Sequence, residues 1–548
     1  MNMFCFQCQE TEEGKGCTIL GACGKSDEVA NLIDLVIYNL KGIASVYETL
    51  RANNVDAFSR ELSVYVTHAL YATVTNVNFV PERHLALVHE GLRFKRTLLD
   101  KAKAASITIA GEAALWDAKT DDDCLRKSYL VGVLTTKDED IRSLRETIIY
   151  GLKGIAAYVN HANVLGFYDT AIFDHMMQAL AATVNEHSID ELMALVLATG
   201  KTMVDAMTIL NKAHGSAFGT PLPNDIPIGV RGNPGILISG HDLKDIAALL
   251  EQTAESGVDV YTHSEMISAH YYPALRKYPH LAGNYGGAWW NQDIEFKSFN
   301  GPVIVTSNCI TPVQDSYLKR IFTTGPAGYP GVERVPNKTG TDTPDFSAVI
   351  ALAKTCPPPS PINTGTVPGG YAHAALPQYA EKIVGLIKEG KIRRFIVIAG
   401  CDGRDARRDY YTEVAKALPH DTMILTAGCA KYRFFKLDLG NIEGIPRIIE
   451  AGQCNDSFSL LSIALELQKV FGKSHINELP VSFDIPWYDQ KAVGVLLALL
   501  YLGVKNVRLG PSFPAFLSPN IQQKIIDAYH LQRIGTPAGD VAAMMEGR

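Results

Sequence analysis

The sequence predicts a multidomain protein of α and α/β class, in which duplicated helical bundles precede α/β domains with parallel sheets. Its 548 residues exceed one ordinary hydrophobic core and favour about two to four domains. A helical repeat fills the first part of the chain. Short apolar runs that end at small residues, each followed by a helical segment, fill the rest. We therefore expect a helical domain over residues 1–221 and α/β domains over residues 222–365 and 366–548.

The composition is that of a soluble globular protein, with 47% hydrophobic and 20% charged residues. A net charge of −7 argues against a nucleic-acid partner. The longest apolar run, residues 492–504, is shorter than the roughly 20 residues of a membrane-spanning helix, and the acidic N-terminus does not resemble a signal peptide. These features predict a cytoplasmic protein without a membrane partner. In a reducing compartment, its ten cysteines are expected to be ligands or thiols and not disulfides.

Four cysteines near the N-terminus, Cys5, Cys8, Cys17 and Cys23, span nineteen residues. Thiolates spaced this closely can surround one tetrahedral centre, either a single zinc or an iron–sulfur cluster. The glycines between them allow the backbone to bend tightly. The alternative is a set of scattered thiols. The sequence therefore predicts a metal or cluster here, and the spacing alone leaves zinc and iron–sulfur open.

An internal repeat identifies the helical part of the chain. The segment IYNLKGIASVY at residues 37–47 recurs as IYGLKGIAAY at residues 149–158, an offset of 112 residues, and ALYATV recurs as ALAATV at an offset of 110. Matched pairs at nearly one offset indicate duplication of a unit of about 110 residues. Apolar positions recur at helical spacing, and each unit has room for about three helices. We predict two three-helix bundles and interpret the shared LKGIA as helix packing, not chemistry.

Ligand-type residues follow three apolar runs in the next part of the chain. His241 follows GILISG and opens an amphipathic helix, His263 and Glu265 end the run VDVYTHSE, and Cys309 follows GPVIVTSN. Taken alone, each of these residues would more often be a helix cap or a satisfied polar group. The recurrence of one design, an apolar strand and then a ligand-type residue, favours a site.

The design recurs three times between residues 394 and 456. FIVIAG precedes Cys401, MILTAG precedes Cys429, and IPRIIEAGQ precedes Cys454. Runs rich in Ile and Val that end at glycine predict buried strands. The carboxyl ends of parallel strands form the edge of an α/β sheet where ligands bind. Three soft ligands at one such edge predict a metal or iron–sulfur site.

A carboxylate in the last third of the chain is a further candidate. Asp489 and Lys491, in PWYDQKAV, begin a predicted buried helix, where the positive end of the helix dipole favours a carboxylate. Near a thiolate-rich metal site, Asp489 becomes a candidate oxygen ligand. Cys124, which follows a run of aspartates, and Cys356, beside three prolines, are interpreted as incidental thiols. The two tryptophans at residues 289–290 are expected to pack, with an electron route as the alternative.

The chain resembles the hybrid-cluster protein family, also called the prismane protein family, over essentially its whole length. The motifs that carry the resemblance are FCFQCQET with the following cysteines, GILISGHDLKD, VDVYTHSEM, SNC, AGCDGR, TAGCAKYR, GQCNDS and WYDQKAV. Agreement of so many segments in order is not expected by chance. The resemblance implies a helical first domain followed by two Rossmann-like α/β domains, which agrees with the predicted boundaries.

The resemblance also implies two clusters. The compact N-terminal spacing resembles members with a 4Fe-4S cluster, which implies this role for Cys5, Cys8, Cys17 and Cys23. A hybrid 4Fe-2O-2S cluster is implied at the interface of the α/β domains, with Cys401 as the persulfide cysteine and Lys491 as a lysine beside the cluster. Its implied ligands are His241, Glu265, Cys309, Cys401, Cys429, Cys454 and Asp489.

One position departs from the family pattern, which has Glu where this chain has Asp489. Asp is one methylene shorter, and a metal–oxygen bond must close to about 2.0–2.2 Å. Either the backbone has shifted, a water bridges the gap, or this ligand is lost.

The resemblance implies hydroxylamine reductase activity, in which hydroxylamine, two electrons and two protons give ammonia and water. Cys401, Glu265, His241 and Lys491 would then be the catalytic residues. Electrons are expected to come from a separate donor protein through the N-terminal cluster, because the sequence has no nucleotide fingerprint or flavin segment. The alternatives are a nitric oxide or peroxide substrate, or a redox sensor or protein nitrosylase acting in nitrosative stress. A carbon monoxide dehydrogenase-like activity is disfavoured by the ligand set.

Overall fold

The computed structural model describes residues 3–375 and 377–548 and divides into two compact units. One unit is mostly helical. It includes α16 (Gln490–Tyr501) and most of α17 (Pro519–Tyr529), although these two helices lie far along the sequence from its other helices. The domain boundaries predicted at residues 221 and 365 stay predictions. We call the two parts the helical unit, made of Met1–Ile209, Asp489–Gly503 and Pro514–Ile525, and the α/β unit, made of Leu210–Tyr488, Val504–Phe513 and Ile526–Arg548.

The helical unit contains two successive sets of three helices, and the first two helices of each set match in length. The first set has 26, 13 and 24 residues, and the second has 26, 13 and 30. This is the duplicated helical architecture expected from the repeat. In chain order the helices are α1 (Asp27–Ala52), α2 (Arg60–Ala72), α3 (Pro81–Ala104), α4 (Glu112–Leu115), α5 (Asp121–Ser128), α6 (Glu139–Val164), α7 (Thr170–Ala182) and α8 (Ile189–Phe218). The end of α8, from Leu210 onward, belongs to the α/β unit.

The equivalent helices of the two sets begin at equivalent caps. The Ser26 side chain accepts a hydrogen bond from the third residue of α1, and Asp138 does the same for α6. Ser59 caps α2, and Asp169 caps α7. Each cap satisfies a backbone N–H that has no partner inside the helix. The starts of these four helices are therefore determined by residues next to them in the sequence.

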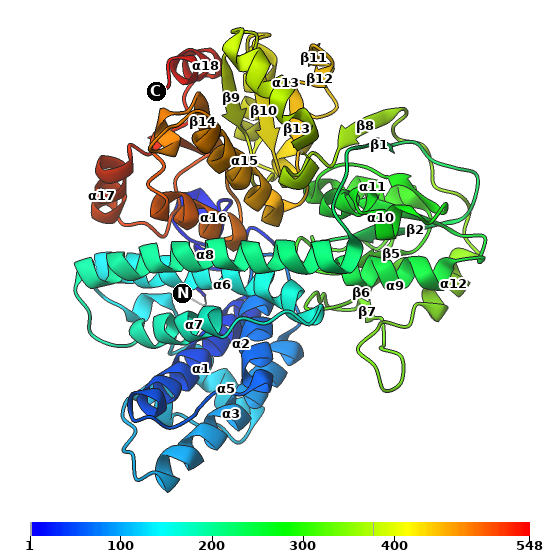
Figure 1. Ribbon diagram of the computed structural model, residues 1–548. Coiled ribbons are helices and arrows are strands. Elements are labelled where there is room, and N and C mark those ends of the chain that lie inside the picture. Colours follow the sequence, from blue (N-terminus) through cyan, green and yellow to red (C-terminus); the bar gives the residue numbers. More distant parts are fainter. Residues whose placement is uncertain (1–2, 376) are drawn as a thin grey trace. The chain divides into compact units, whose positions relative to one another are not determined.

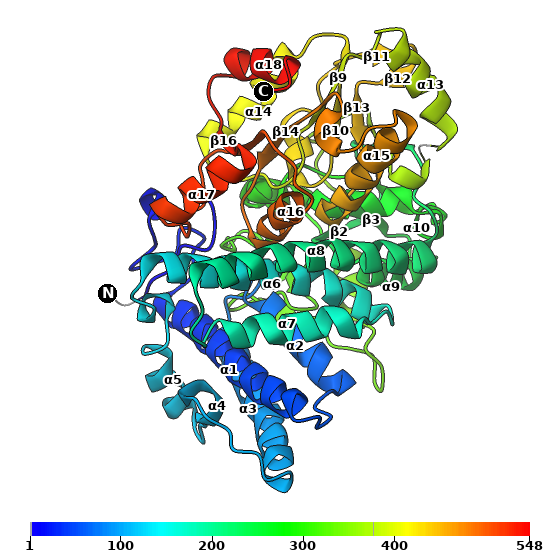
Figure 2. The same ribbon diagram turned by 60° about the vertical axis from the view of Figure 1, so that its left-hand side comes forward.

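The two sets of helices pack against each other. α1 packs against α3 of its own set and α7 of the other, and α2 packs against α6. Tyr47 of α1 donates a hydrogen bond to Asp174 of α7 at 2.9 Å, and one buried cluster joins Tyr71 to Ala157. In both views, α6, α7 and α8 run alongside one another (Figures 1 and 2).

The repeated LKGIA segment allows close helix packing in both of its copies. A Cβ atom at Gly42 would lie 2.1 Å from the Ala113 carbonyl oxygen. A Cβ atom at Gly154 would lie 2.5 Å from the Gln490 carbonyl oxygen, so α6 meets the backbone at the start of α16. The glycine thus serves packing in each copy, against a different partner.

The first sheet of the α/β unit has six parallel strands in the order β4-β3-β2-β5-β6-β7. Its central strands β2 and β3 are buried at every position, as expected for a parallel sheet covered on both faces. The strands are β2 (Gly235–Ser239), β3 (Asp259–His263), β4 (Leu281–Asn284), β5 (Val303–Val305), β6 (Ile321–Thr323) and β7 (Glu333–Arg334), with helices α9 (Leu243–Thr253), α10 (Pro273–Arg276), α11 (Gln292–Phe299) and α12 (Ser347–Ala353).

The second sheet also has six parallel strands, in the order β13-β10-β9-β14-β15-β16. A core of buried Ile, Val, Tyr and Phe side chains, which includes Ile396, Ile424 and Val414, joins this sheet to its helices. The strands are β9 (Arg394–Val397), β10 (Thr422–Thr426), β13 (Ile448–Glu450), β14 (Val481–Pro486), β15 (Val507–Gly510) and β16 (Gln532–Arg533), with helices α13 (Pro377–Lys388), α14 (Asp409–Ala417), α15 (Ser457–Val470) and α18 (Pro537–Met545).

Two short antiparallel pairs complete the α/β unit. β1 (Asn224–Pro227) pairs with β8 (Thr366–Gly369), so the segments on either side of the first sheet meet. β11 (Asn441–Ile442) pairs with β12 (Ile445–Pro446). Together with the helical N-terminal region, the parallel sheets confirm the predicted class of a multidomain α and α/β protein.

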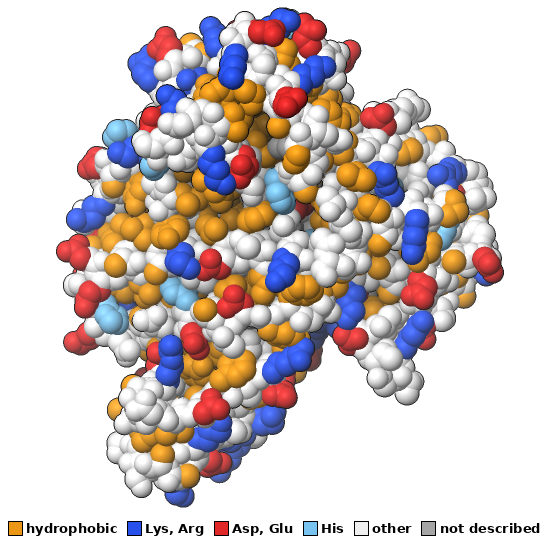
Figure 3. Space-filling view, viewed as in Figure 1, with side chains coloured by type: hydrophobic (Ala, Val, Ile, Leu, Met, Phe, Trp, Pro, Cys, Tyr) orange, Lys and Arg blue, Asp and Glu red, His pale blue; other side chains and the backbone are white. Residues whose placement is uncertain are grey.

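Charged side chains of both signs are interspersed over the face shown in Figure 3. Among the described residues, α1 and α8 are long and apolar enough to cross a membrane by length and composition. In α1, 78% of the apolar window is buried inside the protein, and in α8, 44%. Core helices of soluble proteins meet the same criteria, so these two helices are weak indications of a membrane span.

We predict that Gly154→Ala destabilises the helical unit by about 1–3 kcal/mol, because the added methyl group meets the Gln490 carbonyl and forces α6 and α16 apart. Denaturant unfolding followed by the helical circular dichroism signal measures the change. Gly385→Ala in α13 is the matched control, since no atom lies within 4 Å of its Cβ position. We expect the control to be neutral or slightly stabilising, and equal effects of the two substitutions would contradict the packing role.

Candidate metal centres

Six side chains of the α/β unit stand just past the carboxyl ends of parallel strands. The strands that carry them are neighbours in each sheet: β3, β2 and β5 in the first, and β13, β10 and β9 in the second. Parallel strands end at the same edge of their sheet, so each sheet presents three such residues together. In that order, the residues are Glu265, His241 and Cys309, then Cys454, Cys429 and Cys401.

Three of these side chains converge on one buried point. Ligand atoms of His241, Glu265 and Cys454 all lie within 4.8 Å of one another. The Cys454 backbone N–H donates a hydrogen bond to Glu265 Oε2 at 2.8 Å. Because His241 and Glu265 come from the first sheet and Cys454 from the second, the group is assembled from both. An imidazole, a carboxylate and a thiolate at this spacing fit a metal ion.

Cys429 belongs to the same neighbourhood. Burial, followed by the nearby charges of Glu265, Cys309 and Cys401, raises the pKa of its thiol well above the usual value. Its Sγ atom shares a hydrogen bond with Ser264 Oγ at 3.4 Å. A buried thiol in such surroundings becomes a stable thiolate only beside a cation. The donor set therefore fits an iron centre with sulfur ligands.

Close backbone approaches position Cys401 at the end of β9. The Cys401 N–H donates to the Pro486 carbonyl at 2.9 Å, and the Cys401 carbonyl accepts a hydrogen bond from Arg408 Nη1 at 3.3 Å. The preceding Gly400 has φ 137°, and a Cβ atom there would lie 2.2 Å from the Pro486 oxygen. Only glycine fits this turn.

Cys309 is held in a strained conformation, with a φ of 99°. Non-glycine residues in this region cost about 1–3 kcal/mol and persist where the surroundings hold them. Asn308 Nδ2 donates to Cys309 Sγ at 3.3 Å, and Gln292 Nε2 donates to the Cys309 carbonyl at 2.6 Å. Contacts with neighbouring side chains, and not the backbone preference of cysteine, therefore hold the sulfur in place.

The imidazole of His241 is oriented through Ser307. Ser307 Oγ lies 2.9 Å from the His241 backbone nitrogen and 3.0 Å from Nδ1. A hydrogen bond at Nδ1 makes Nε2 the nitrogen that would bind a metal. The serine stands two residues before Cys309, so one loop supports two of the predicted ligands.

A buried ion pair lies beside Glu265 and was not predicted from the sequence. Lys431 Nζ is 2.6 Å from Glu450 Oε1 and 3.7 Å from Glu265 Oε1, and both partners of the shorter pair are fully buried. The charges of Glu450 and Glu265 outweigh burial and raise the pKa of Lys431. Lys431 therefore stays charged and offsets Glu265. It stands two residues after Cys429, but no sequence signal pairs it with Glu450.

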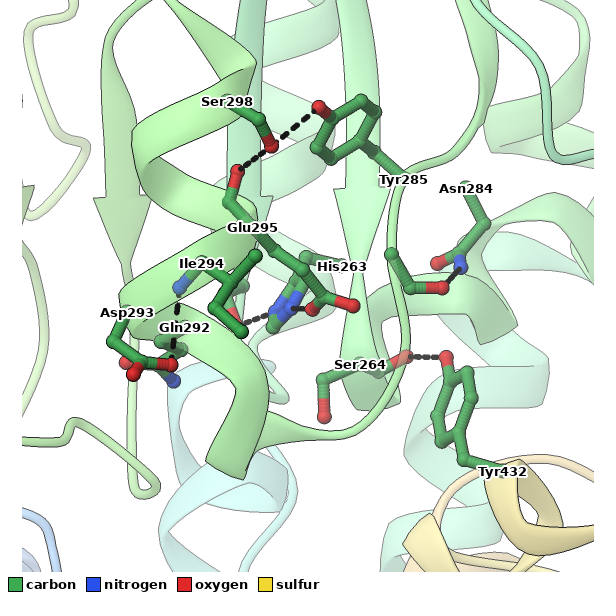
Figure 4. A network of polar contacts seen from close by, with 12 residues as sticks. His263, Ser264, Asn284, Tyr285, Gln292, Asp293, Ile294, Glu295, Ser298 and Tyr432 are labelled. Carbon is green, nitrogen blue, oxygen red and sulfur yellow. Dashed lines mark hydrogen bonds and ion pairs between the residues drawn. The ribbon is translucent and has the colours of Figure 1, made fainter. Parts of the chain in front are cut away.

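A second polar network surrounds the turn that leads to Glu265 (Figure 4). His263 is fully buried, with Nδ1 2.9 Å from Ser239 Oγ and Nε2 2.8 Å from Glu295 Oε2. The next residue, Ser264, has a φ of 55°, and its carbonyl accepts a hydrogen bond from Tyr432 at 2.7 Å. This network anchors the end of β3, which places Glu265.

The tryptophans at residues 289–290 contact the residue after Cys401. Trp289 Nε1 donates to the Asp402 carbonyl at 3.2 Å, and Trp290 Nε1 donates to Asp402 Oδ2 at 2.9 Å. Arg433 Nε donates to Asp402 Oδ1 at 2.7 Å. These residues fix the loop that follows Cys401, and an electron route stays the untested alternative.

Asp489 and Lys491 belong to the helical unit, at the start of α16. Asp489 caps that helix, because its Oδ1 accepts the Lys491 backbone N–H at 2.8 Å. Its Oδ2 lies 4.0 Å from Lys491 Nζ. Their roles as a cluster ligand and as a catalytic lysine stay predictions.

The four N-terminal cysteines lie together in the helical unit. Cys5 and Cys17 face each other in an antiparallel bridge, with backbone hydrogen bonds of 3.0 and 2.8 Å. Burial raises the pKa of Cys5 to about 11. Burial, followed by the charges of Cys23 and Cys5, raises the pKa of Cys8 well above its usual value. Cys8, Cys17 and Cys23 are buried and Cys5 is partly buried. Neighbouring thiols of this kind fit an iron–sulfur cluster, whose ligand sulfurs stand farther apart than those around a single ion.

Comparisons with known proteins identify the family and the fold. The model of the Prismane/CO dehydrogenase family matches residues 3–542. A hydroxylamine reductase of Desulfitobacterium hafniense (strain Y51) is 53% identical over 549 residues, and one of Nitratidesulfovibrio vulgaris (strain Hildenborough) is 51% identical over 556, with all of both chains covered in each case. Carbon monoxide dehydrogenase IV from Carboxydothermus hydrogenoformans has a similar fold, with a TM-score of 0.59 at 15% identity, over 99% of this chain and 92% of that chain.

We predict that His263→Ala weakens metal binding in the α/β unit about 10–100-fold, because the turn that presents Glu265 loses its anchor. Iron content per chain and low-temperature EPR spectra measure the loss. Asp293→Asn, at an exposed position on α11, is the matched control and should leave both unchanged.

Adding Ser264→Gly to His263→Ala tests the cause. Glycine adopts the positive φ of residue 264 without strain, so the double variant should regain part of the lost iron. An iron content that stays at the level of His263→Ala would show that His263 does not act by holding the turn.

Proposed function

Because this chain belongs to the Prismane/CO dehydrogenase family, we propose that it is an iron–sulfur oxidoreductase that reduces hydroxylamine. The observation that carries the proposal is the identity of 53% and 51% to hydroxylamine reductases over the full length of both chains. The reaction takes hydroxylamine, two electrons and two protons, and gives ammonia and water. One N–O bond breaks, and the nitrogen is reduced.

The four N-terminal cysteines would hold a 4Fe-4S cluster, and the side chains gathered in the α/β unit would hold a hybrid 4Fe-2O-2S cluster. Thiolates suit sulfide-bridged iron, while imidazole and carboxylate suit harder iron that carries oxygen. When bound, such a cluster supplies electrons and a place for the substrate. The mixed set of His241, Glu265 and Cys454 supports a centre of uneven coordination.

The residues of the chain contribute position, charge and protons. Glu265 and His241 are the nearest acid and base candidates in the α/β unit, and both are almost fully buried. Lys431 places a positive charge 3.7 Å from Glu265. A nearby positive charge favours a carboxylate, which is the form that would bind a metal. Lys491 is retained as a further proton donor candidate. The burial of the group excludes bulk water from the reacting atoms.

A separate protein would supply the electrons, since the sequence has no nucleotide fingerprint and no flavin segment. We further propose a cytoplasmic location, which suits a chain with ten cysteines and no disulfide among its described residues.

We predict that Cys401→Ala lowers the reduction of hydroxylamine by a reduced viologen dye at least about 100-fold in anaerobically purified protein, because a lost ligand costs no less than a lost supporting contact. Cys356→Ala, at a loop thiol outside both groups, is the control and should retain full activity. Wild-type protein should contain about eight irons per chain, four for each cluster.

Unchanged activity in Cys401→Ala would remove this group from the reaction. Comparing kcat/KM for hydroxylamine, nitric oxide and peroxide in the same preparation decides which of them is the substrate. Protein that holds both clusters but reduces none of the three substrates would support the sensor alternative.

A further inference from the structure

A cavity of about 40 Å³ lies in the helical unit beside Cys5. This volume has room for about two or three water molecules. Five ionisable side chains besides Cys5 and Tyr150 line it, and the metal-binding groups described above do not include them. They are Lys25, Asp34, Lys41, Glu146 and Lys153.

Four of these side chains are related by the duplication of the helical unit. Asp34 of α1 and Glu146 of α6 are 112 residues apart, and so are Lys41 and Lys153. In each helix the acid precedes the lysine by seven residues, about two helical turns, which places both on one face. The lysines are those of the repeated LKGIA segment. Each copy of the repeat therefore contributes one acid and one lysine to a single cavity.

The cavity holds these groups at unusual proton affinities. Burial, followed by the charge of Glu146, raises the pKa of Asp34 to about 7. Burial also raises the pKa of Glu146, against the lowering effect of Lys41 and Lys153. Burial, followed by the charge of Lys25, lowers the pKa of Lys153 to about 8. Two carboxyl groups that repel each other in one cavity bind protons as a coupled pair.

The cavity borders the candidate N-terminal centre on one side and an outer hollow on the other, because both neighbours share lining residues with it. Cys5 lines its wall, and Lys153 Nζ donates a hydrogen bond to Gln7 Oε1, between Cys5 and Cys8, at 2.9 Å. Asp34 also lines a more open hollow of about 270 Å³. A Cβ atom on Gly132, which lines both, would lie 2.9 Å from Asp34 Oδ2. Asp34 thus separates the inner cavity from the outer one.

We propose that Asp34 and Glu146 form a proton-binding site coupled to the redox state of the centre held by Cys5, Cys8, Cys17 and Cys23. The inference rests on the proposed iron–sulfur cluster at these cysteines. When the donor protein adds one electron to the cluster, the carboxyl pair takes up one proton from solvent through the outer hollow. Reoxidation of the cluster returns that proton. Charge near Cys5 then stays constant over the cycle.

The groups that face Asp34 account for the direction of the effect. From α6 these are Glu146, Tyr150 and Lys153, from its own helix Lys41, and from the N-terminal loop Lys25 and Cys5, while Lys137 lines the outer hollow. An added electron makes the surroundings more negative, which raises the affinity of a carboxylate for a proton. The midpoint potential of the cluster must then fall as the pH rises.

The test is a potentiometric titration of the N-terminal cluster in the full-length protein, followed by EPR between pH 6 and pH 8.5. We expect the midpoint potential of the wild type to fall by up to about 59 mV per pH unit near neutral pH, the one-electron value for a tenfold change in proton concentration. The variant Asp34→Asn with Glu146→Gln should show a potential independent of pH. Glu28→Gln, an exposed position on α1, should titrate like the wild type.

A potential independent of pH in the wild type, or an equal slope in the double variant, would overturn the proposal. If the double variant does not assemble its cluster, Lys41→Met provides the second measurement. Removal of that lysine takes away a charge that lowers the pKa of Asp34, so the pH range of the slope should move upward. A range that does not move would also overturn the proposal.

The potentiometric titration contains no hydroxylamine, so its result does not depend on which substrate the protein reduces. Iron content shows separately whether the cysteines hold a cluster at all. Zinc in place of iron at the N-terminal site would refute the cluster assignment itself, before any question of proton coupling arises.

Discussion

Buried negative charge is the constraint on which both candidate metal centres depend. Thiolates and carboxylates removed from water are strongly disfavoured unless positive charge is close by. In the α/β unit, Cys429 and Glu265 are almost fully buried, and Lys431 is the cation that lies 3.7 Å from Glu265. In the helical unit, burial raises the pKa of Cys5 while the charge of Lys25 lowers it. The fold supplies part of the compensating charge through lysines, and metal binding would supply the rest.

The parts of the site that the sequence predicted are those determined locally. A strand, a small residue and a ligand follow one another within ten residues, so Cys401, Cys429 and Cys454 could be placed past strand ends before any pairing was known. Their adjacency on β9, β10 and β13 follows from sheet order, which is not a local property. The helix starts at Ser26 and Asp138 were likewise local.

The supporting contacts could not be predicted in the same way. His263 meets Glu295 across 32 residues, and Lys431 meets Glu450 across 19, through folds of the chain that no spacing rule encodes. The positive φ values at Ser264 and Cys309 are also invisible in the sequence, because both residue types normally avoid that region. Ser264 precedes the predicted ligand Glu265, and Cys309 is itself a predicted ligand, so both strained positions lie where function is expected to hold strain.

The duplicated segment shows how one motif can serve two physical roles. In LKGIA, the glycine permits close packing, against Ala113 in one copy and Gln490 in the other. The lysine next to it points from each helix into one cavity. Helix packing therefore explains the repeated glycine but not the repeated lysine. Because both copies have an acid two turns before the lysine, duplication places like charges opposite each other. Glu146 and Lys153 are buried and their partners are partly buried, and this loss of solvent shifts the proton affinities of the groups.

The same reasoning bears on Asp489, where the family pattern has Glu. Asp is among the strongest N-terminal caps of helices, since its short side chain reaches the backbone N–H groups of the first turn. In this chain, Asp489 Oδ1 is engaged in that way at the start of α16. Metal ligation through Oδ1 would compete with the cap, while Oδ2 lies 4.0 Å from Lys491 Nζ. The substitution therefore exchanges the reach of a longer side chain for a cap at the start of α16. A shifted backbone, a bridging water and the loss of this ligand stay the alternatives.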